Sequence, residues 1–346
     1  MLPGMMITAR LLNALAVIAD TKDGPVQIIN EARATELLKN AAGDVTGVRY
    51  ECPEGQFTAK GVVVLATGGW AADFTKSSLL ARFRPDLLNF PTTNGEHCTG
   101  DGVKMAEAVG AGLVQLDRVQ IHPTGLVDPD NPNSKFKVLG AEAMRGVGGI
   151  LLNSKGKRFC NEMGRRDYVS GRMLAQKDSG PFYLVLNAQS VAELKWHIDS
   201  YMAMGLMVKV SSGRALAQHL QLQEEVVATL FNDYQRAAED GKDTFGTTEL
   251  KNANAFNMMG EFYVCTVAPV VHYCMGGIAI DAMAQVLDRR KNQKIAGLYA
   301  SGECAGGIHG ANRLAGSSLL DCVVFGRIAG QNAARYLQQL PEASPA

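Results

Sequence analysis

The sequence predicts an α/β fold in which a second, α+β domain is inserted between two segments of the first domain. The stretch VVVLATGG at 62–69 is an apolar run typical of a buried parallel strand, and it ends in two glycines. A second strand-like run, KIAGLYASGE at 294–303, also meets a glycine. Between them, residues 118–272 carry proline-containing loops and short helical or strand-like stretches. We therefore expect one α/β domain built from residues 1–117 and 273–346, with residues 118–272 as an inserted domain.

Local composition predicts the individual elements in chain order. Asp101 lies near the start of a predicted helix, where an acidic side chain is favourable. The polar stretch HPTGLVDPDNPNSK at 122–135 predicts loops. The predicted elements are a helix at 5–19, β-rich stretches at 26–32, 45–51 and 57–67, a helix at 103–111, helical structure at 213–240 and a long helix at 317–340.

The totals exclude several classes of function. A length of 346 residues predicts about two domains. Lys+Arg and Asp+Glu both number 34, so no excess of positive charge points to nucleic acid or to an anionic membrane surface. The longest apolar stretches, such as 11–19, are far shorter than the roughly 20 residues of a membrane span, and we expect a soluble chain. The first residues lack the pattern of a signal peptide.

The cysteines and the common motifs narrow the chemistry further. Seven scattered cysteines without a CxxC pair predict free thiols in a reducing compartment, and we expect the cytoplasm or a mitochondrion. The six histidines stand far apart, so no metal site is expected. The sequence contains no G-x-G-x-x-G, no P-loop and no G-x-S-x-G elbow. Neither a nicotinamide-binding fold of the usual form nor serine-based hydrolysis is therefore indicated.

Polar side chains set among glycines and prolines form a candidate site. Each has an ordinary structural interpretation when taken alone: Arg313 can cap a helix, and Glu142 with Arg145 can be a surface pair at i, i+3. Taken together, they flank the predicted inserted domain, which is where a site between two domains would form. The set is His122, Glu142, Arg145, Arg166, His272 and Arg313.

The order of these segments resembles the fumarate reductase/succinate dehydrogenase flavoprotein family. The likeness is closest to the soluble eukaryotic fumarate reductases of yeast and trypanosomatid type, and it covers nearly the whole chain. It implies an FAD-binding α/β domain and a capping domain that enclose a four-carbon dicarboxylate against the flavin. The motifs that carry it are VVLATGG, TTNG…TGDG, QIHPTG, GAEAMRGVGGILLNSKGKRFCNE…RD, VVHYCMGGIAID, GLYASGE and GGIHGANRLAGSSLLD.

The resemblance implies roles for the substrate-binding residues. Arg313 and His272 would hold one carboxylate, and His122 the other. Glu142 and the backbone near Gly316 would complete the pocket. These residue types suit the task, because a guanidinium matches a carboxylate in a bidentate manner and stays charged at any working pH.

The resemblance also implies the catalytic and cofactor residues. Reduction of fumarate to succinate needs a hydride from reduced FAD at one carbon and a proton at the other. Arg166 would donate that proton, and Glu142 and Arg145 would return it. Arginine has a pKa above about 12, so this role requires a strongly basic acceptor. The positions that match non-covalent FAD contacts are Ala66, Asp101, Glu303, Arg313, Ser318 and Leu319.

Two departures from the family pattern bear on function. Ala141 stands where many bacterial members have a threonine that helps to bind substrate, but the soluble eukaryotic members also tend to have alanine at this position. The family's dinucleotide fingerprint and its serine- and glycine-rich flavin loop precede the family segment that Met1 matches, so we expect a partial FAD-binding domain. Two alternatives therefore stay open: an inactive remnant that does not hold FAD, and an enzyme for a steroid or another enoate. The carboxylate clamps argue against the latter. The electron donor is open, with NADH or a reduced flavin as candidates.

Overall fold

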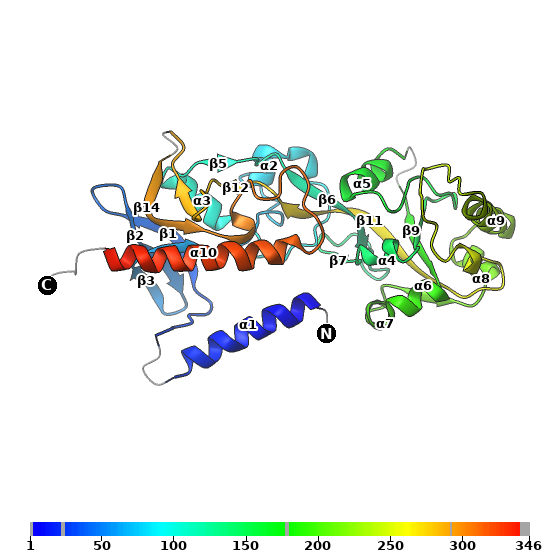
Figure 1. Cartoon of the computed structure of the whole chain (residues 1–346), viewed down its shortest axis with the longest axis horizontal. Helices are drawn as coiled ribbons and strands as arrows, with labels where there is room; N and C mark the ends of the chain where they lie inside the picture. Colours follow the sequence, from blue (N-terminus) through cyan, green and yellow to red (C-terminus); the bar gives the residue numbers. More distant parts are fainter. Residues whose placement is uncertain (1–2, 22–24, 177–179, 291–292, 340–346) are drawn as a thin grey trace. The chain divides into compact units, whose positions relative to one another are not determined.

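The computed structural model describes residues 3–21, 25–176, 180–290 and 293–339, and it divides into two compact units. The first unit is built from three separate segments of the chain, and the second from two (Figure 1). Residues 119–272 of the predicted inserted domain, 118–272, lie in the second unit, to which residues 84–97 and residue 273 also belong. The first unit comprises 1–83, 98–118 and 274–346, and the second comprises 84–97 and 119–273.

The first unit is built around a small sheet in which two distant segments pair in parallel. β4 (Val63–Leu65) pairs with β14 (Lys294–Ala300), so Leu65 lies opposite Ala300. Parallel pairing places the glycine-containing turns that follow the two strands at the same edge of the sheet. β13 (Gln285–Leu287) extends this sheet beyond β14. The other strands form a three-stranded antiparallel sheet, β1 (Arg33–Lys39), β2 (Val45–Cys52) and β3 (Gly55–Lys60), and a short pair, β5 (Leu113–Val114) with β12 (Gly277–Ile278).

One long helix covers the parallel sheet of the first unit. Ala329 and Ala333 of this helix, α10 (Ser317–Gln339), are buried with Tyr299 of β14, and their small side chains let the helix approach the strand closely. The helices of this unit are α1 (Pro3–Ala19), α2 (Leu79–Phe83), α3 (Asp101–Ala108), the short 3-10 helix η3 (Gly302–Cys304) and α10 (Ser317–Gln339).

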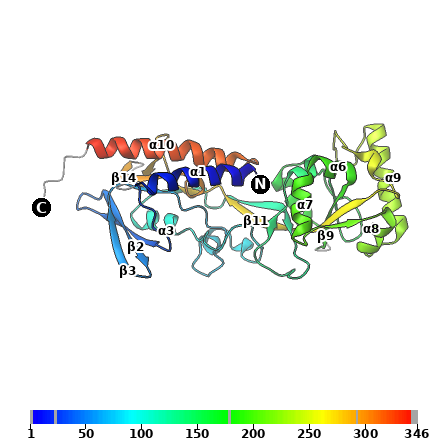
Figure 2. The same ribbon diagram turned by 90° about the horizontal axis from the view of Figure 1, so that it is seen from below.

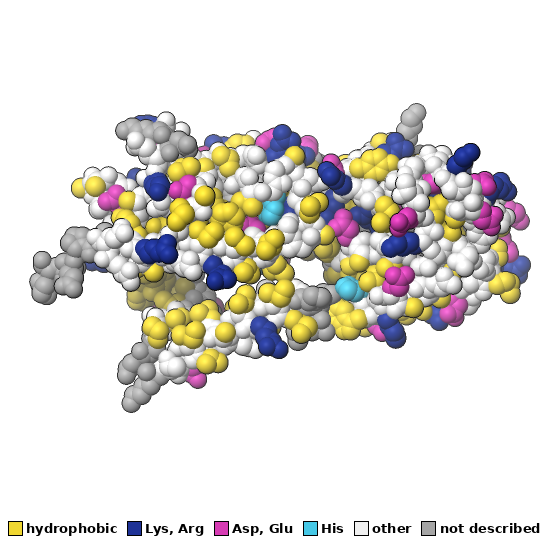
Figure 3. Space-filling model, viewed as in Figure 1, with side chains coloured by type: hydrophobic (Ala, Val, Ile, Leu, Met, Phe, Trp, Pro, Cys, Tyr) yellow, Lys and Arg dark blue, Asp and Glu magenta, His cyan; other side chains and the backbone are white. Residues whose placement is uncertain are grey.

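The first unit leaves an apolar surface exposed on two neighbouring helices. α1 runs alongside α10 (Figures 1 and 2), yet none of residues 4–19 is buried. Leu12 is 64% exposed and Val17 70% exposed, and apolar side chains gather over both helices (Figure 3). A helix that is apolar on all sides is normally covered by other parts of a protein. None of the helices in the described part of the chain has the length and apolarity that crossing a membrane requires.

The second unit is a six-stranded sheet with a hydrophobic core on each face. Side chains alternate between the two faces along each strand. Leu184 and Leu186 of β9 accordingly pack in one core, and Val185 packs in the other. The strands lie in the order β7 (Val138–Leu139), β6 (Val119–Leu126), β11 (Phe262–Cys274), β9 (Phe182–Asn187) and β8 (Ile150–Leu152), and β10 (Val208–Val210) also pairs with β11.

Helices pack around this sheet. The 3-10 helix η1 comes from the segment 84–97, which is tied to the unit because Thr93 N–H donates to Val271 O at 3.0 Å. The helices are η1 (Pro85–Leu87), α4 (Ala143–Gly146), α5 (Arg166–Leu174), α6 (Ala188–Glu193), α7 (Lys195–Ala203), α8 (Gly213–His219), α9 (Glu224–Asp240) and η2 (Ala253–Ala255).

Two predictions of local structure were wrong, and a third was confirmed with an added detail. The β-rich stretch 26–32 is irregular, and the first strand begins only at Arg33. The polar stretch that begins at His122 was expected to be a loop, but residues 119–126 form strand β6, paired along an antiparallel sheet despite Pro123. The helical structure predicted at 213–240 is confirmed, and it consists of two helices because the chain turns between them at Gln221, whose φ is +57°.

Candidate active site

In the second unit, one carboxylate bridges two arginines. Glu142 Oε1 accepts from Arg145 Nη2 at 3.0 Å, and Glu142 Oε2 accepts from Arg166 Nη2 at 3.1 Å and from Arg166 Nε at 3.3 Å. Glu142 immediately precedes α4, so Arg145 follows it by one helical turn, while Arg166 is the first residue of α5. Three residues that were predicted from the sequence therefore form one connected hydrogen-bonded group.

This arginine–glutamate group lies largely out of water. The side chains of Arg145 and Arg166 are 2% and 6% exposed, and that of Glu142 is 30% exposed. Burial lowers the pKa of Arg145 below its usual value, and the attraction of the Glu142 carboxylate opposes that shift. Arg145 also donates to the carbonyl oxygens of Glu162 and Gly164. The group can therefore hold protons on neighbouring nitrogens whose environments differ.

A residue that was not predicted from the sequence binds the third nitrogen of the Arg166 guanidinium. Gln120 Oε1 accepts from Arg166 Nη1 at 2.7 Å, and Gln120 is buried. Ser170 of α5 donates to Ile121 O at 3.1 Å and ties the helix to strand β6. Gln120, His122 and Thr124 alternate along β6 and so lie on one face of the strand. That period of two was the available signal, and it was overlooked because the segment was interpreted as a loop.

Two histidines from neighbouring strands also meet in the second unit. The ring centroids of His122 and His272 lie 5.1 Å apart with the planes at 62°. His122 is completely buried in strand β6, and His272 is near the end of β11. Each Nδ1 has a threonine beside it, at 3.1 Å for Thr124 Oγ1 and 2.7 Å for Thr93 Oγ1. Neither threonine was identified from the sequence.

In the first unit, Glu303 lies against the glycine turn that follows β4. A Cβ atom on Gly69 would be only 2.4 Å from Glu303 Oε1, so only glycine fits there with the carboxylate in place. Glu303 Oε1 accepts from Cys274 N–H at 2.8 Å. Burial raises the pKa of Glu303 to about 7, while the hydrogen bond from Cys274 and the charge of Arg313 act in the opposite direction.

The remaining predicted cofactor residues lie on elements that converge on the same turn. The start of α3 packs on the residue after Ala66, since a Cβ on Gly102 would lie 2.1 Å from Thr67 Oγ1. Asp101 begins that helix and pairs with Arg33, whose Nη2 is 3.1 Å from Asp101 Oδ2. Ala66 itself is exposed.

Arg313 and Gly316 belong to the turn that leads into α10. Gly316 has a φ of +80°, which disfavours any other residue, and a Cβ there would meet nothing within 4 Å. Ser318 and Leu319 are in the first turn of the helix. The same segment carries a pair that the sequence did not reveal, because His309 Nε2 lies 3.4 Å from the buried Asp321 Oδ2. The predicted residues thus fall into two groups, one in each unit.

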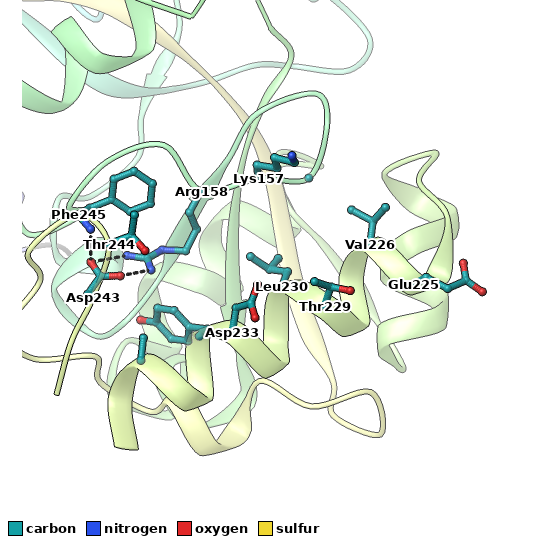
Figure 4. A pocket seen from close by; sticks show the side chains of 13 residues that line it. Lys157, Arg158, Glu225, Val226, Thr229, Leu230, Asp233, Asp243, Thr244 and Phe245 are labelled. Carbon is teal, nitrogen blue, oxygen red and sulfur yellow. Dashed lines mark hydrogen bonds and ion pairs between the residues drawn. The ribbon is translucent and has the colours of Figure 1, made fainter. Parts of the chain in front are cut away.

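A well-formed cavity elsewhere in the second unit contains none of the predicted residues. It has a volume of about 530 Å³ and lies between α9 and the segments at 156–158 and 243–245 (Figure 4). Arg158 occupies one side of it, bonded to Asp243 and Glu162 and stacked over the ring of Tyr234. Since its charge is matched by two carboxylates, this arginine has a structural role. In the described part of the chain, no group of three or more His, Cys, Asp or Glu could hold a metal ion.

Comparison with known proteins finds close relatives. The family described as FAD binding domain matches residues 1–319. A fumarate reductase of Schizosaccharomyces pombe is 48% identical over 317 residues, which are 89% of this chain and 60% of that protein. Fumarate reductase 1 of Saccharomyces cerevisiae is 37% identical over 346 residues, 96% of this chain and 71% of that protein.

A solved structure is similar as well. The open conformation of a flavocytochrome c3 fumarate reductase superposes with a TM-score of 0.69 at 34% identity, over 88% of this chain and 52% of that one. The matched part of this chain therefore spans between 52% and 71% of the lengths of these three proteins.

Proposed function

Because the chain belongs to the FAD binding domain family and, within it, to the fumarate reductase flavoproteins, we propose that it takes part in the FAD-dependent reduction of fumarate to succinate. The observation that carries this proposal is the Glu142 carboxylate held between two buried arginines. Such an arrangement suits delivery and return of a proton in a site with little water. The likeness to two named fumarate reductases supports the same substrate class.

A four-carbon dicarboxylate is the proposed substrate. The proposed substrate contacts, carried over from the family resemblance, are His122, His272, Glu142, Arg313 and the backbone at Gly316. Two carboxylates need donors at both ends, and the side chains supply imidazole and guanidinium N–H groups for that purpose. Binding both ends fixes the alkene in place, and orientation of this kind contributes several kcal/mol to catalysis, at most on the order of 10.

The proposed chemistry divides between the cofactor and the chain. When bound, reduced FAD supplies the hydride that reaches one alkene carbon. Arg166 donates a proton from its guanidinium to the other carbon, so that two electrons and two protons in total convert fumarate to succinate. Glu142 then passes a proton from Arg145 to Arg166 along the hydrogen bonds described above, and a proton taken up from solvent restores Arg145. The lowered pKa of Arg145 favours that return.

The residues of the first unit fit a flavin. The Gly68 and Gly316 backbones have positive φ, and a Cβ on either would meet no atom within 4 Å, so a flat ligand can approach them closely. The start of the long helix α10 offers backbone N–H groups and a partial positive charge to an anionic ring edge. We propose that FAD binds there without a covalent bond. Its proposed contacts are Ala66, Asp101, Glu303, Arg313, Ser318 and Leu319.

One observation favours the alternative that residues 1–346 alone do not hold FAD. Within the described residues, strand β4 pairs with β14 on one edge only, and the neighbouring helix α1 is exposed along its length. In the described part of the first unit, the other edge of β4 beside the proposed cofactor residues is therefore left without a strand partner. A purified chain that shows no flavin absorbance, even after incubation with FAD, would establish this alternative.

The proton-donor role is tested with two adjacent arginines. Arg166→Ala should abolish the fumarate-dependent reoxidation of a reduced dye, because no other described side chain occupies the same position between Gln120 and Glu142. Arg165→Ala is the matched control, since Arg165 is exposed and makes no side-chain cap, and it should keep its activity. Arg313→Ala should also abolish turnover. Retained turnover in Arg166→Ala would remove this residue from the proton-donor role. The electron donor is tested by replacing the reduced dye in this assay with NADH or with a free reduced flavin.

A further inference from the structure

We propose that Glu162 is a positioning residue that fixes Arg145, the arginine from which Glu142 takes its proton. The Glu162 carboxylate is anchored by Arg158, and its backbone carbonyl oxygen holds the Arg145 guanidinium. Every contact that carries the inference lies within the second unit. Only the use of Arg145 for the return of a proton rests on the function proposed above.

Glu162 binds a different arginine with each of its ends. Its carboxylate accepts two hydrogen bonds from Arg158, from Nε to Oε1 at 2.9 Å and from Nη2 to Oε2 at 2.7 Å. Its backbone carbonyl oxygen accepts from Arg145 Nη1. A displacement of the Glu162 side chain would therefore move the carbonyl oxygen that holds Arg145.

The carboxylate end of Glu162 is held by strand β8 and by a second carboxylate. Leu151 N–H donates to Glu162 Oε1 at 3.2 Å, and Arg158 Nη1 donates to Asp243 Oδ1 at 2.7 Å (Figure 4). The side chains of Arg158, Glu162 and Asp243 are 8%, 5% and 2% exposed, so water hardly competes for these bonds. The anchor is therefore both buried and hydrogen-bonded.

A buried ion pair of this kind needs an explanation other than stability. Removing two charges from water costs about as much as their attraction returns, and apolar residues of similar volume often serve as well. The pair does impose one arrangement, because a guanidinium binds both carboxylate oxygens only in a shared plane. Residues 159–165 form no helix or strand, so the pair between Arg158 and Glu162 fixes the course of this irregular segment.

The irregular segment in turn holds Arg145 and leads into Arg166. Arg145 Nη1 also donates to Gly164 O at 3.1 Å, and Arg145 Nη2 donates to Glu142 Oε1 at 3.0 Å. Arg166 begins helix α5 two residues after Gly164. The position of Glu162 therefore bears on both arginines that Glu142 bridges.

The two arginines that Glu162 binds differ in how firmly they hold a proton. Burial alone would lower the pKa of Arg158, but the hydrogen bonds and charges of Glu162 and Asp243 raise it above its usual value. Burial lowers the pKa of Arg145, although the Glu142 carboxylate opposes that shift. Arg158 is therefore a permanently charged anchor, and Arg145 is the arginine suited to proton exchange.

Nitrogen-15 NMR of arginine-labelled chain 1–346 tests the inference without flavin or fumarate. The Arg145 signals are assigned as those that Arg145→Lys removes. Its two Nη nitrogens should give separate signals, because one is held by two carbonyl oxygens and the other by a carboxylate. Glu162→Gln should shift or average these signals, since the amide N–H groups that it introduces would face the Arg158 donors. A single averaged Nη signal in the unmodified chain, or unchanged signals in Glu162→Gln, would overturn the proposal.

A matched variant separates positioning from a general loss of charge around Arg158. Asp243→Asn removes the other carboxylate but leaves the two bonds between Arg158 and Glu162, so the Arg145 signals should stay in place. Equal shifts in Asp243→Asn and Glu162→Gln would overturn the inference. If Glu162→Gln does not fold, Arg158→Lys replaces it, because lysine keeps the charge but cannot bind both oxygens of Glu162 in one plane. Unchanged Arg145 signals in Arg158→Lys would equally overturn it.

Turnover of the FAD-loaded chain separates this inference from the proposed function. Glu162→Gln should lower kcat for fumarate roughly 10- to 100-fold with KM unchanged, since misplacing a group by about 1 Å costs up to that much. Glu224→Gln, which breaks a surface pair with Arg214, is the control and should keep both constants. Shifted Arg145 signals with an unchanged kcat would show that Glu162 positions Arg145 but that Arg145 does not return the proton. That result would contradict the proposed function alone, whereas unshifted signals contradict the positioning role.

Discussion

At the scale of single residues, charge and burial set the properties of the site. Glu142 separates two arginines that would otherwise repel each other in a region with little water. In the first unit, by contrast, the Glu303 carboxylate lies against backbone, and burial raises its pKa. A carboxylate therefore bridges two arginines in the second unit, whereas in the first unit a carboxylate with a raised pKa lies beside the backbone of a glycine turn.

We predict that Glu142→Gln destabilises the protein as well as impairing its chemistry. The amide cannot neutralise Arg145 and Arg166, and we expect a loss of about 1 to 3 kcal/mol in the free energy of unfolding. Chemical unfolding measures this loss. Glu249→Gln is the control, since Glu249 is exposed, and it should unfold like the unmodified chain. Equal stability of the two variants would show that the bridge contributes little.

Glu303 predicts a dependence of stability on pH. Its pKa of about 7 in the folded state is above the unfolded value, so the folded state binds the proton more tightly. Stability is highest when the carboxyl is protonated in both states, falls as the pH rises through the unfolded pKa, and levels off above about pH 7. The total loss is on the order of 3 kcal/mol.

The variant Glu303→Gln isolates this effect. An amide oxygen can still accept from Cys274 N–H but does not titrate. The unfolding free energies of Glu303→Gln and the unmodified chain should therefore diverge between about pH 4.5 and 7, with the variant the more stable at the upper end. Parallel curves over that interval would contradict the raised pKa.

At the scale of elements, close approach decides which glycines are required. Gly102 in helix α3 lies against Thr67, whereas Gly171 in helix α5 is exposed and has no atom near the position of its missing Cβ. Both positions are helical, so intrinsic helix propensity favours alanine equally at both. The difference between them is purely one of tertiary packing.

These two glycines predict opposite effects of the same substitution. Gly171→Ala should raise the free energy of unfolding by up to about 1 kcal/mol through helix propensity. Gly102→Ala should lower it, because the new Cβ would lie 2.1 Å from Thr67 Oγ1 and displace the start of α3. Thermal unfolding of both variants provides the measurement. Stabilisation by Gly102→Ala would mean that α3 does not pack on Thr67 as described.

The sequence indicated candidate residues for the site, but the local structure around some of them was predicted incorrectly. The polar residues of the proposed site could be predicted because each lies in a glycine- or proline-rich segment. Gln120, Thr124 and Thr93 were missed because their role comes from strand β6 and from its partner β11, about 150 residues later in the chain. A strand that contains Pro123 and is surrounded by loop-like composition carries no local signal strong enough to reveal that pairing.

At the scale of the whole molecule, the exposed apolar surface of α1 and α10 is the dominant feature. Leu320 is 64% exposed, and Val323 and Val324 of the same helix are exposed as well. Exposed apolar patches of this kind favour association or coverage by other polypeptide, since each buried Å² contributes about 25 cal/mol. The chain also spans only part of the length of its first relatives.

We predict that charged residues introduced on this surface reduce its tendency to bind apolar molecules and to associate, without unfolding the protein. Leu12→Glu and Val324→Glu should lower the binding of a hydrophobic dye and any concentration-dependent association, while the melting temperature stays within a few degrees. Met259→Glu, at a residue 89% exposed in the second unit, is the control and should leave dye binding unchanged. A large loss of stability in Leu12→Glu would show that α1 is packed in solution.

The sequence by itself determined the family and the fold class, and it predicted most residues of the proposed site, because those depend on side-chain chemistry and on glycine and proline in short segments. Only the tertiary structure decided how these residues interact: that Glu142 joins two arginines, that Gly69 makes room for Glu303, and that Thr124 faces His122 Nδ1. The physical reason is that hydrogen-bond partners, burial and close approach arise from segments far apart in the chain. No local pattern records which of them will meet.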